Sequence, residues 1–136
     1  MQRAAIAYLD GLPDAAALTH GDFHLDNVMM PPQGMRVIDW SKAAAGHPAA
    51  DAVQSEMLMR FGVGPTDWVT NLWRDWAARR MRRAYLAGSP VTPRDLDQWR
   101  AVVALAWLRA CDAVRTPAFL RYLNRALRRC GIDPLA

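Results

Sequence analysis

The sequence has almost no lysine, because Lys42 is the single lysine among its 17 basic residues. Arginine supplies the rest of the positive charge, and the formal net charge is +4 at neutral pH. Surfaces that bind nucleic acids more often mix the two basic residues, so this charge is only a weak indication of a polyanionic partner. We therefore do not expect a nucleic-acid partner, and keep a basic helical nucleic-acid binder as the last of three functions considered.

Cysteine is scarce as well, and long apolar runs are absent. Cys111 and Cys130 each fall in a segment of helical pattern, and neither has a CxxC partner or a neighbouring metal ligand. We expect buried free thiols in a reducing compartment. No apolar run reaches the ~18 residues that cross a bilayer, and no basic-then-apolar signal peptide opens the chain. These absences predict a cytoplasmic protein that makes no contact with a membrane.

The composition that remains is typical of a folded domain, with 52% hydrophobic and 22% charged residues. A helical pattern dominates the chain after residue 48. Proline, threonine and aspartate stand at the expected helix starts, and glycine stands at several of the ends. The predicted helices cover residues 2–10, 49–60, 65–86, 92–114 and 116–131.

A short β-hairpin is predicted before the helical region. A turn at residues 31–34 joins strands at 27–30 and 35–39, while residues 17–20 are expected to be extended and 43–48 to form a loop. The predicted fold class is therefore mainly α with a small β-hairpin, in a single domain over residues 1–136. Its parts are a leading helix and turn (1–17), a loop and hairpin (18–48) and a helical bundle (49–136).

Tryptophan and arginine in the helices each allow two interpretations. Packing between helices is the expected role of the helical tryptophans, and a base-stacking platform is the alternative. The arginines of residues 79–83 are expected to form a solvated helix surface, with phosphate contact as the alternative. The helical tryptophans are Trp68, Trp73, Trp76, Trp99 and Trp107.

Polar side chains with catalytic potential are concentrated between residues 18 and 40. If the hairpin pivots about Gln33, residues whose numbers sum to 66 face each other, so Asn27 faces Asp39. Their amide and carboxylate oxygens suit Mg²⁺, which takes few protein ligands. Asp22, five residues before Asn27, is then a candidate base beside a phosphate-bridging metal, as phosphoryl transfer requires.

Other interpretations of this segment are simpler. The polar residues could merely cap and hydrogen-bond turns, and Asp26 is expected to be solvated or to stabilise a turn. His24 could contact a phosphate or a metal, but bracing of the loop is the expected role. A zinc site made of His20, His24 and His47 is also conceivable, although the His-x3-His spacing of helical zinc pairs falls here on a loop.

The motif His-Gly-Asp-x4-Asn at residues 20–27, followed by a hairpin and Val-Ile-Asp-Trp at residues 37–40, resembles the catalytic core of the aminoglycoside phosphotransferase and choline kinase group. The layout is similar to that of protein kinases. The resemblance implies the C-terminal lobe of a protein-kinase-like fold, and ATP- and Mg²⁺-dependent transfer of a phosphoryl group to a hydroxyl of a small substrate. It implies that Asp22 is the catalytic base and that Asn27 and Asp39 are the magnesium ligands.

Two further residues have supporting roles by the same resemblance. His20 resembles the residue that braces the catalytic loop, the task that the residues alone already suggest for His24. Asp51 resembles an aspartate that supports this loop from the next helix. Ser41 departs from the pattern, since many relatives have an acidic residue there, so a second metal or substrate contact is in doubt.

The nucleotide-covering part of the family pattern is not found. No glycine-rich loop precedes Asp22, and Lys42 follows Asp39, so it cannot be the strand lysine of an upper lobe. We expect that an N-terminal lobe is lost, cut off or supplied in trans, and that this chain alone has little activity. The sequence identifies no residues that contact the nucleotide. The expected partner is that lobe or a second copy of the chain. A non-catalytic helical binding module derived from the family is the alternative function.

Overall fold

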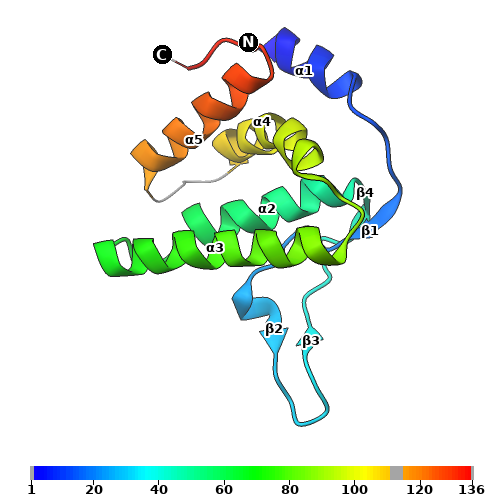
Figure 1. The fold of residues 1–136 in the computed structure, drawn as a ribbon, viewed down its shortest axis with the longest axis vertical. Coiled ribbons are helices and arrows are strands. Elements are labelled where there is room, and N and C mark those ends of the chain that lie inside the picture. Colours follow the sequence, from blue (N-terminus) through cyan, green and yellow to red (C-terminus); the bar gives the residue numbers. More distant parts are fainter. Residues whose placement is uncertain (1, 111–114, 136) are drawn as a thin grey trace.

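The computed structural model describes residues 2–110 and 115–135, which form a helical bundle with a projecting hairpin (Figure 1). The predicted fold class, mainly α with a small β-hairpin, is confirmed. The helices of this part of the chain are α1 (Gln2–Asp10), α2 (Pro48–Phe61), α3 (Trp68–Gly88), α4 (Pro93–Ala110) and α5 (Thr116–Arg129). The short elements are β1 (Ala17–Thr19), the 3-10 helix η1 (Leu25–Asn27), β2 (Val28–Met29), β3 (Arg36–Val37) and β4 (Ala44–Gly46).

Local side-chain caps explain where the helices begin. Asp67 caps α3 by accepting a hydrogen bond from the Thr70 backbone N–H at 3.0 Å. At α4, the Asp95 carboxylate accepts from the Thr92 N–H at 2.7 Å, and the Thr92 hydroxyl accepts from the Asp95 N–H at 3.2 Å. Such reciprocal caps satisfy backbone donors that the first helical turn leaves unpaired.

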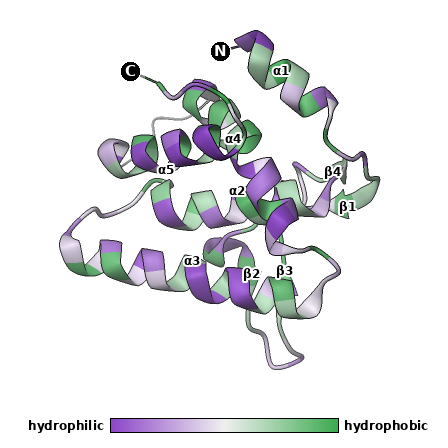
Figure 2. Cartoon of the chain, turned by 45° about the horizontal axis from the view of Figure 1, so that its top comes forward, coloured by the Kyte–Doolittle hydropathy of each residue, from purple (hydrophilic) through white to green (hydrophobic). Residues whose placement is uncertain are grey.

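Helix α2 is the central element of the hydrophobic core. It buries Val53, Met57 and Phe61 against α4 and α5, and the Phe61 and Phe119 rings meet edge-on at 5.5 Å between centroids. Figure 2 shows hydrophobic and hydrophilic residues alternating along the helices, as expected where one face is buried. Helix α2 also contains Asp51, which the sequence assigns to the support of the polar loop.

A network of buried and partly buried charges connects the helices. The Glu56 carboxylate of α2 accepts from Arg100 of α4 at 3.1 Å, and both side chains are nearly inaccessible. The Asp75 carboxylate of α3 accepts from Arg60 at 3.2 Å and from Arg115 at 3.0 Å. Burial raises the pKa of Asp75, but Arg115 and Arg60 lower it by more, so the pKa lies below its ordinary value.

One sheet was not predicted, because residues 43–48 were expected to be a loop. In the structure β4 pairs antiparallel with β1, with Leu18 opposite Ala45 and Thr19 opposite Ala44. The segment Ala-Ala-Gly has no intrinsic preference for strand, so only the pairing with a distant segment makes it one. The expectation of a loop there was wrong.

The tryptophans also differ from prediction. Trp107 is buried and Trp99 packs against the core, as expected for residues between helices. Trp68, Trp73 and Trp76 of α3 are 78%, 52% and 56% exposed, so the packing role predicted for these three was wrong.

Two remaining expectations concern cysteine and membranes. Cys130 is a half-buried free thiol against the core, and the position of Cys111 lies outside the described residues. None of the helices seen in residues 2–110 and 115–135 is long and apolar enough to cross a bilayer.

Candidate active site

The loop at residues 20–22 is attached to the first turn of α2 by Asp51. One carboxylate oxygen of Asp51 accepts from the His20 backbone N–H at 2.8 Å, and the other accepts from the Gly21 N–H at 2.8 Å. A charged acceptor that bonds to two successive N–H groups fixes both the position and the orientation of this backbone. The conformation of the loop is therefore set from α2.

Gly21 allows this loop to approach the segment after Asp39. Its φ of +78° lies in the left-handed region, and a Cβ atom at this position would stand 2.6 Å from the Lys42 carbonyl oxygen. Any other residue would clash with that backbone as well as strain its own. The segments around Asp22 and Lys42 are consequently in contact.

His20 connects the loop to the hairpin. The ring is buried, its Nε2 lies 2.9 Å from the Ile38 carbonyl oxygen, and its Nδ1 accepts from the Asp22 N–H at 3.2 Å. Because Nδ1 is an acceptor here, the proton belongs on Nε2, which donates to Ile38. The imidazole also lies against Trp40, with 4.6 Å between ring centroids.

Asp22 points toward a basic partner. Its side chain is 17% exposed, and its Oδ2 lies 2.9 Å from the Nζ of Lys42. Asn27 is buried, and its Nδ2 donates to the Asp22 carbonyl oxygen at 2.9 Å while lying 3.3 Å from His24 Nε2. The Asn27 amide is thereby held against the backbone of Asp22.

The hairpin register is shifted by one residue from the prediction. Val28 pairs with Val37 and Met29 with Arg36, so paired numbers sum to 65. The Ile38 N–H donates to the Asn27 carbonyl at 2.9 Å, so Asn27 lies opposite Ile38, and the predicted pairing with Asp39 was wrong. A one-residue shift moves a side chain to the other face of a regular ladder.

Asp39 leaves the regular strand at this point. Its φ is +58°, so the backbone departs from the extended conformation and the alternation of faces no longer applies. Its Oδ1 accepts from the Ser41 hydroxyl at 2.6 Å and from the Ser41 N–H at 3.4 Å. These two bonds hold the pKa of Asp39 below its ordinary value, so the carboxylate is ionised at neutral pH.

The chemistry of Asn27 and Asp39 fits a magnesium ion. Nδ2 of Asn27 is bound to the loop, which leaves the amide oxygen as the acceptor, and Asp39 supplies an ionised carboxylate. One or two such oxygens, with water and phosphate oxygens, are what Mg²⁺ takes. No group of three or more His, Cys, Asp or Glu side chains arranged for a metal occurs in the part of the chain that the structure describes.

The other predicted side chains lie close to this loop. His24 Nδ1 is 3.6 Å from the carboxylate of Asp26, whose side chain is 95% exposed. His47 is the N-cap of α2, where its Nδ1 accepts from the Ala49 N–H at 3.1 Å, and its ring stacks on Trp99. The three histidines are thus engaged in separate local contacts.

A model of the phosphotransferase enzyme family matches residues 1–102. The chain belongs to this family. The matched region covers the loop, the hairpin and α1 to α3, together with the first half of α4.

Curated relatives match shorter stretches. Acyl-CoA dehydrogenase family member 11 of Gallus gallus is 46% identical over 41 residues, which is 28% of this chain and 5% of the relative. The Homo sapiens protein of the same name is 40% identical over 57 residues, which is 38% of this chain and 7% of the relative. The chain therefore spans a small fraction of the length of these relatives. No solved structure gives a significant match.

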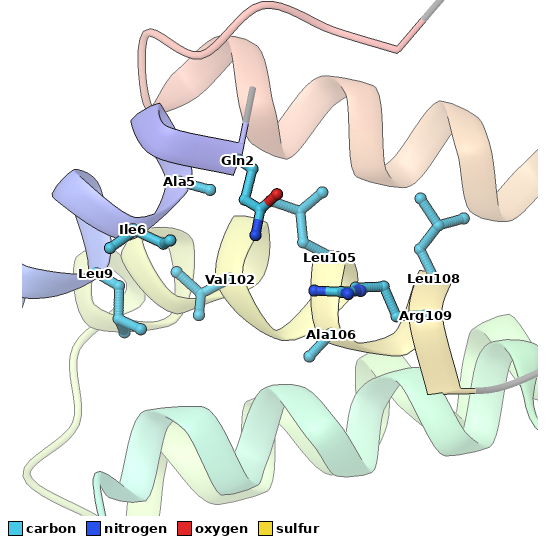
Figure 3. Close-up of a pocket in the computed structure, with 9 residues that line it drawn as sticks. All are labelled: Gln2, Ala5, Ile6, Leu9, Val102, Leu105, Ala106, Leu108 and Arg109. Carbon is cyan, nitrogen blue, oxygen red and sulfur yellow. The ribbon is translucent and has the colours of Figure 1, made fainter.

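Two cavities differ in their relation to the loop. One of about 500 Å³ lies beside it, with His24, Asp26, Trp73 and Arg74 in its wall. Another, of about 530 Å³, lies between α1 and α4, where Ile6 and other apolar side chains from both helices face it (Figure 3). The first therefore adjoins the segment that follows Asp22, whereas the lining of the second contains none of the predicted site residues.

The sequence interpretation missed two contacts of the site. The ion pair of Lys42 with Asp22 joins residues 20 positions apart, and the Ser41 hydroxyl donates a hydrogen bond to the Asp39 carboxylate. The signal for the first was the isolation of the single lysine three residues after Asp39. For the second there was only the departure at Ser41 from the family pattern.

Proposed function

We propose that this chain carries the phosphoryl-transfer residues of a small-molecule kinase, which uses ATP to phosphorylate a hydroxyl group of its substrate. The observation that carries the proposal is the attachment of the Asn27 amide to the Asp22 backbone, with Asp39 adjacent to the residue that pairs with Asn27. Three residues that the family resemblance singles out thus lie on connected segments. Membership of the phosphotransferase enzyme family supports the same reaction class.

In this proposal Asp22 is the general base. The substrate oxygen attacks the γ-phosphorus of ATP, the bond to the β-phosphate oxygen breaks to release ADP, and Asp22 accepts the hydroxyl proton. Asn27 and Asp39 would hold Mg²⁺, which when bound would neutralise part of the negative charge of the phosphates. His20 and Asp51 act as positioning residues, since they fix the loop on which Asp22 stands.

Lys42 joins the site as a positioning residue. Its ammonium orients the Asp22 carboxylate and places a positive charge beside the base. The lysine side chain is 63% exposed, whereas the loop backbone is held by Asp51. A compact ammonium close to the attacking oxygen would also favour the approach of the anionic phosphates.

We further propose that the 136-residue chain has little turnover alone. Its sequence contains neither a glycine-rich loop nor a strand lysine ahead of Asp22, and phosphoryl transfer depends mainly on positioning of the phosphates. Those contacts would come from a lobe outside these residues. Robust transfer by the 136-residue chain to hydroxylated amines would contradict this part of the proposal.

Binding of Mg²⁺·ATP tests the site without requiring turnover. Calorimetric titration of the chain with ATP should show weak binding that needs Mg²⁺ and is lost in Asp39→Asn. The matched control is Asp26→Asn, which alters an exposed carboxylate on the same loop and should leave binding unchanged. Equal Mg²⁺-dependent binding by Asp39→Asn and the unchanged chain would rule out Asp39 as a ligand.

A non-catalytic binding module is the second candidate, and one observation favours it. Trp68, Trp73 and Trp76 form an exposed apolar surface on α3, outside the loop and hairpin that carry the proposed catalytic residues. Binding of a partner that survives in both Asp22→Ala and Asp39→Ala, combined with no nucleotide binding, would favour this alternative.

A further inference from the structure

The outer face of α3 carries an apolar stripe that nothing in the described chain covers. We define the stripe as Trp68, Val69, Leu72, Trp73 and Trp76, which are 78%, 54%, 61%, 52% and 56% exposed. At 100° per residue these positions fall within an arc of about 140° on one side of the helix. Monomeric proteins rarely expose so many large apolar side chains together, so the stripe indicates an interface.

Toward the C-terminal end of α3, the same side of the helix carries arginines instead of apolar residues. Arg79, Arg80 and Arg83 follow the stripe on the same arc and are exposed. Within residues 2–110 and 115–135, none of these three has an ion-pair partner, whereas Arg60 and Arg100 are each paired with Glu56. The outer face therefore has an aromatic half followed by a guanidinium half.

We propose that two copies of the chain pair through this face, with their α3 helices antiparallel. If the two-fold axis passes near Trp76, each residue meets residues of the second copy at the same height and on the same lateral side of the face. At 100° per residue from Trp68, Trp73 at about 140° then lies beside Arg80 of the second copy at about 120°, and Leu72 at about 40° beside Arg79 at about 20°. Guanidinium groups stack favourably on indole faces, and each such contact occurs twice across the axis.

The opposite orientation of the helices is unfavourable. A parallel arrangement would place the arginines of both copies against one another and bury like charges. It would also place the aromatic half of one copy against the aromatic half of the other, so that no guanidinium group faces a tryptophan. Antiparallel pairing is thus the arrangement in which the two halves of the face complement each other.

The available area is adequate for such a dimer. A tryptophan side chain contributes up to about 250 Å², so the exposed fractions of the three tryptophans amount to roughly 450 Å² per copy. Leu72, Val69 and the arginine stems add to this, and a standard interface needs about 800 Å² per partner. Tryptophan and arginine are also the residues that most often dominate binding energy at interfaces.

The dimer would border the candidate active site. Trp73 also lines the cavity beside His24 and Asp26, so a second copy seated on α3 would bring a guanidinium group to the rim of that cavity. The inference does not rest on the proposed kinase activity, because it follows from the surface of α3 alone. It can be tested on a chain that has no turnover.

Sedimentation equilibrium of the 136-residue chain is the test. The unchanged chain should be a reversible dimer, and Trp76→Glu should raise the dissociation constant at least about 100-fold, because two central tryptophans are lost across the axis. Arg80→Glu should weaken the dimer without altering the core, so it keeps the test valid if Trp76→Glu fails to fold. Met30→Glu is the matched control, since Met30 is 75% exposed on the hairpin, and it should leave the dimer unchanged.

Three results would overturn the proposal. A chain that stays monomeric up to about 100 μM has too weak a pairing for a specific dimer. Dissociation by Met30→Glu but not by Trp76→Glu or Arg80→Glu would place the interface on the hairpin. A monomer that instead sediments with vesicles rich in phosphatidylserine would assign the Trp and Arg halves of the face to a lipid surface.

Discussion

Replacing Asp51 by alanine removes the acceptor of two backbone N–H groups at once. The groups belong to His20 and Gly21, and both bonds are 2.8 Å long in a partly buried setting. A hydrogen bond to a charged acceptor contributes about 1.5–3 kcal/mol, and a buried donor left without a partner has an additional cost. The Asp51→Ala chain should therefore be about 3–5 kcal/mol less stable, unless water enters and reduces the loss.

The loss should be confined mainly to the loop. Amide hydrogen exchange measured by NMR should show the His20 and Gly21 N–H groups exchanging at least about 10-fold faster in Asp51→Ala, as expected for a locally opened segment. Urea unfolding should give the loss of stability. The matched control is Asp26→Ala, because Asp26 is exposed on the same loop and no backbone bond to its carboxylate is found in the described residues.

Two results would contradict this role of Asp51. Unchanged exchange at His20 and Gly21 in Asp51→Ala would show that the carboxylate does not hold the loop. A uniform increase of exchange over α2 and α4 would instead mean that Asp51 stabilises the bundle rather than the loop.

The remaining predictions concern backbone strain and pH. Gly21→Ala should lower the free energy of unfolding, measured in urea, by about 3 kcal/mol, because φ is +78° and the new Cβ would lie 2.6 Å from the Lys42 carbonyl oxygen. The control Gly34→Ala places its Cβ where no atom lies within 4 Å and should lower it by about 1 kcal/mol. Equal losses in the two variants would contradict the close approach at Gly21. Asp75 has a lowered pKa in the folded chain, so its contribution to stability is present above the unfolded pKa of about 4 and is lost as pH falls through the lower folded pKa. Asp75→Asn should flatten the acid limb of a stability–pH profile below about pH 4, and an unchanged slope would exclude the role of its pairing with Arg115 and Arg60.

The helices could be predicted well because their signals are local. The helix at residues 2–10 was predicted with the bounds that the structure shows, and Thr92 with Asp95 marked the start of α4. The start of α3 was predicted three residues early, at Pro65. Arg74 explains the difference, because its buried guanidinium binds the carbonyls of Met59, Gly62 and Pro65 and holds that segment as a loop.

The errors arose where distant segments decide the structure. Strand β4 has the composition of a loop and becomes a strand only through its pairing with β1. The hairpin register depended on the turn, where the Gly34 N–H donates to the Pro31 carbonyl at 2.9 Å and centres the turn between Pro32 and Gln33. The hydrophobic pattern could not resolve this shift, because both strands pair over only two residues.

The candidate site was predictable as a set of residues but not as a geometry. Asp22, Asn27 and Asp39 do lie on connected segments, but the connection runs through the Asn27 amide and the Ile38 backbone rather than through a direct pairing. The left-handed φ of Asp39 has no clear signal in the sequence, since aspartate adopts it only occasionally. Their catalytic and metal-binding roles stay predictions.

A titration with Mn²⁺ and ATP, followed by NMR, tests the magnesium site most directly. Mn²⁺ is a paramagnetic ion that takes oxygen ligands as Mg²⁺ does. We expect the side-chain amide signal of Asn27 and the backbone signals around Asp39 to broaden first, and Asp39→Asn to abolish this broadening. Broadening that begins elsewhere, for instance at the exposed carboxylate of Asp26, and persists in Asp39→Asn would contradict this expectation.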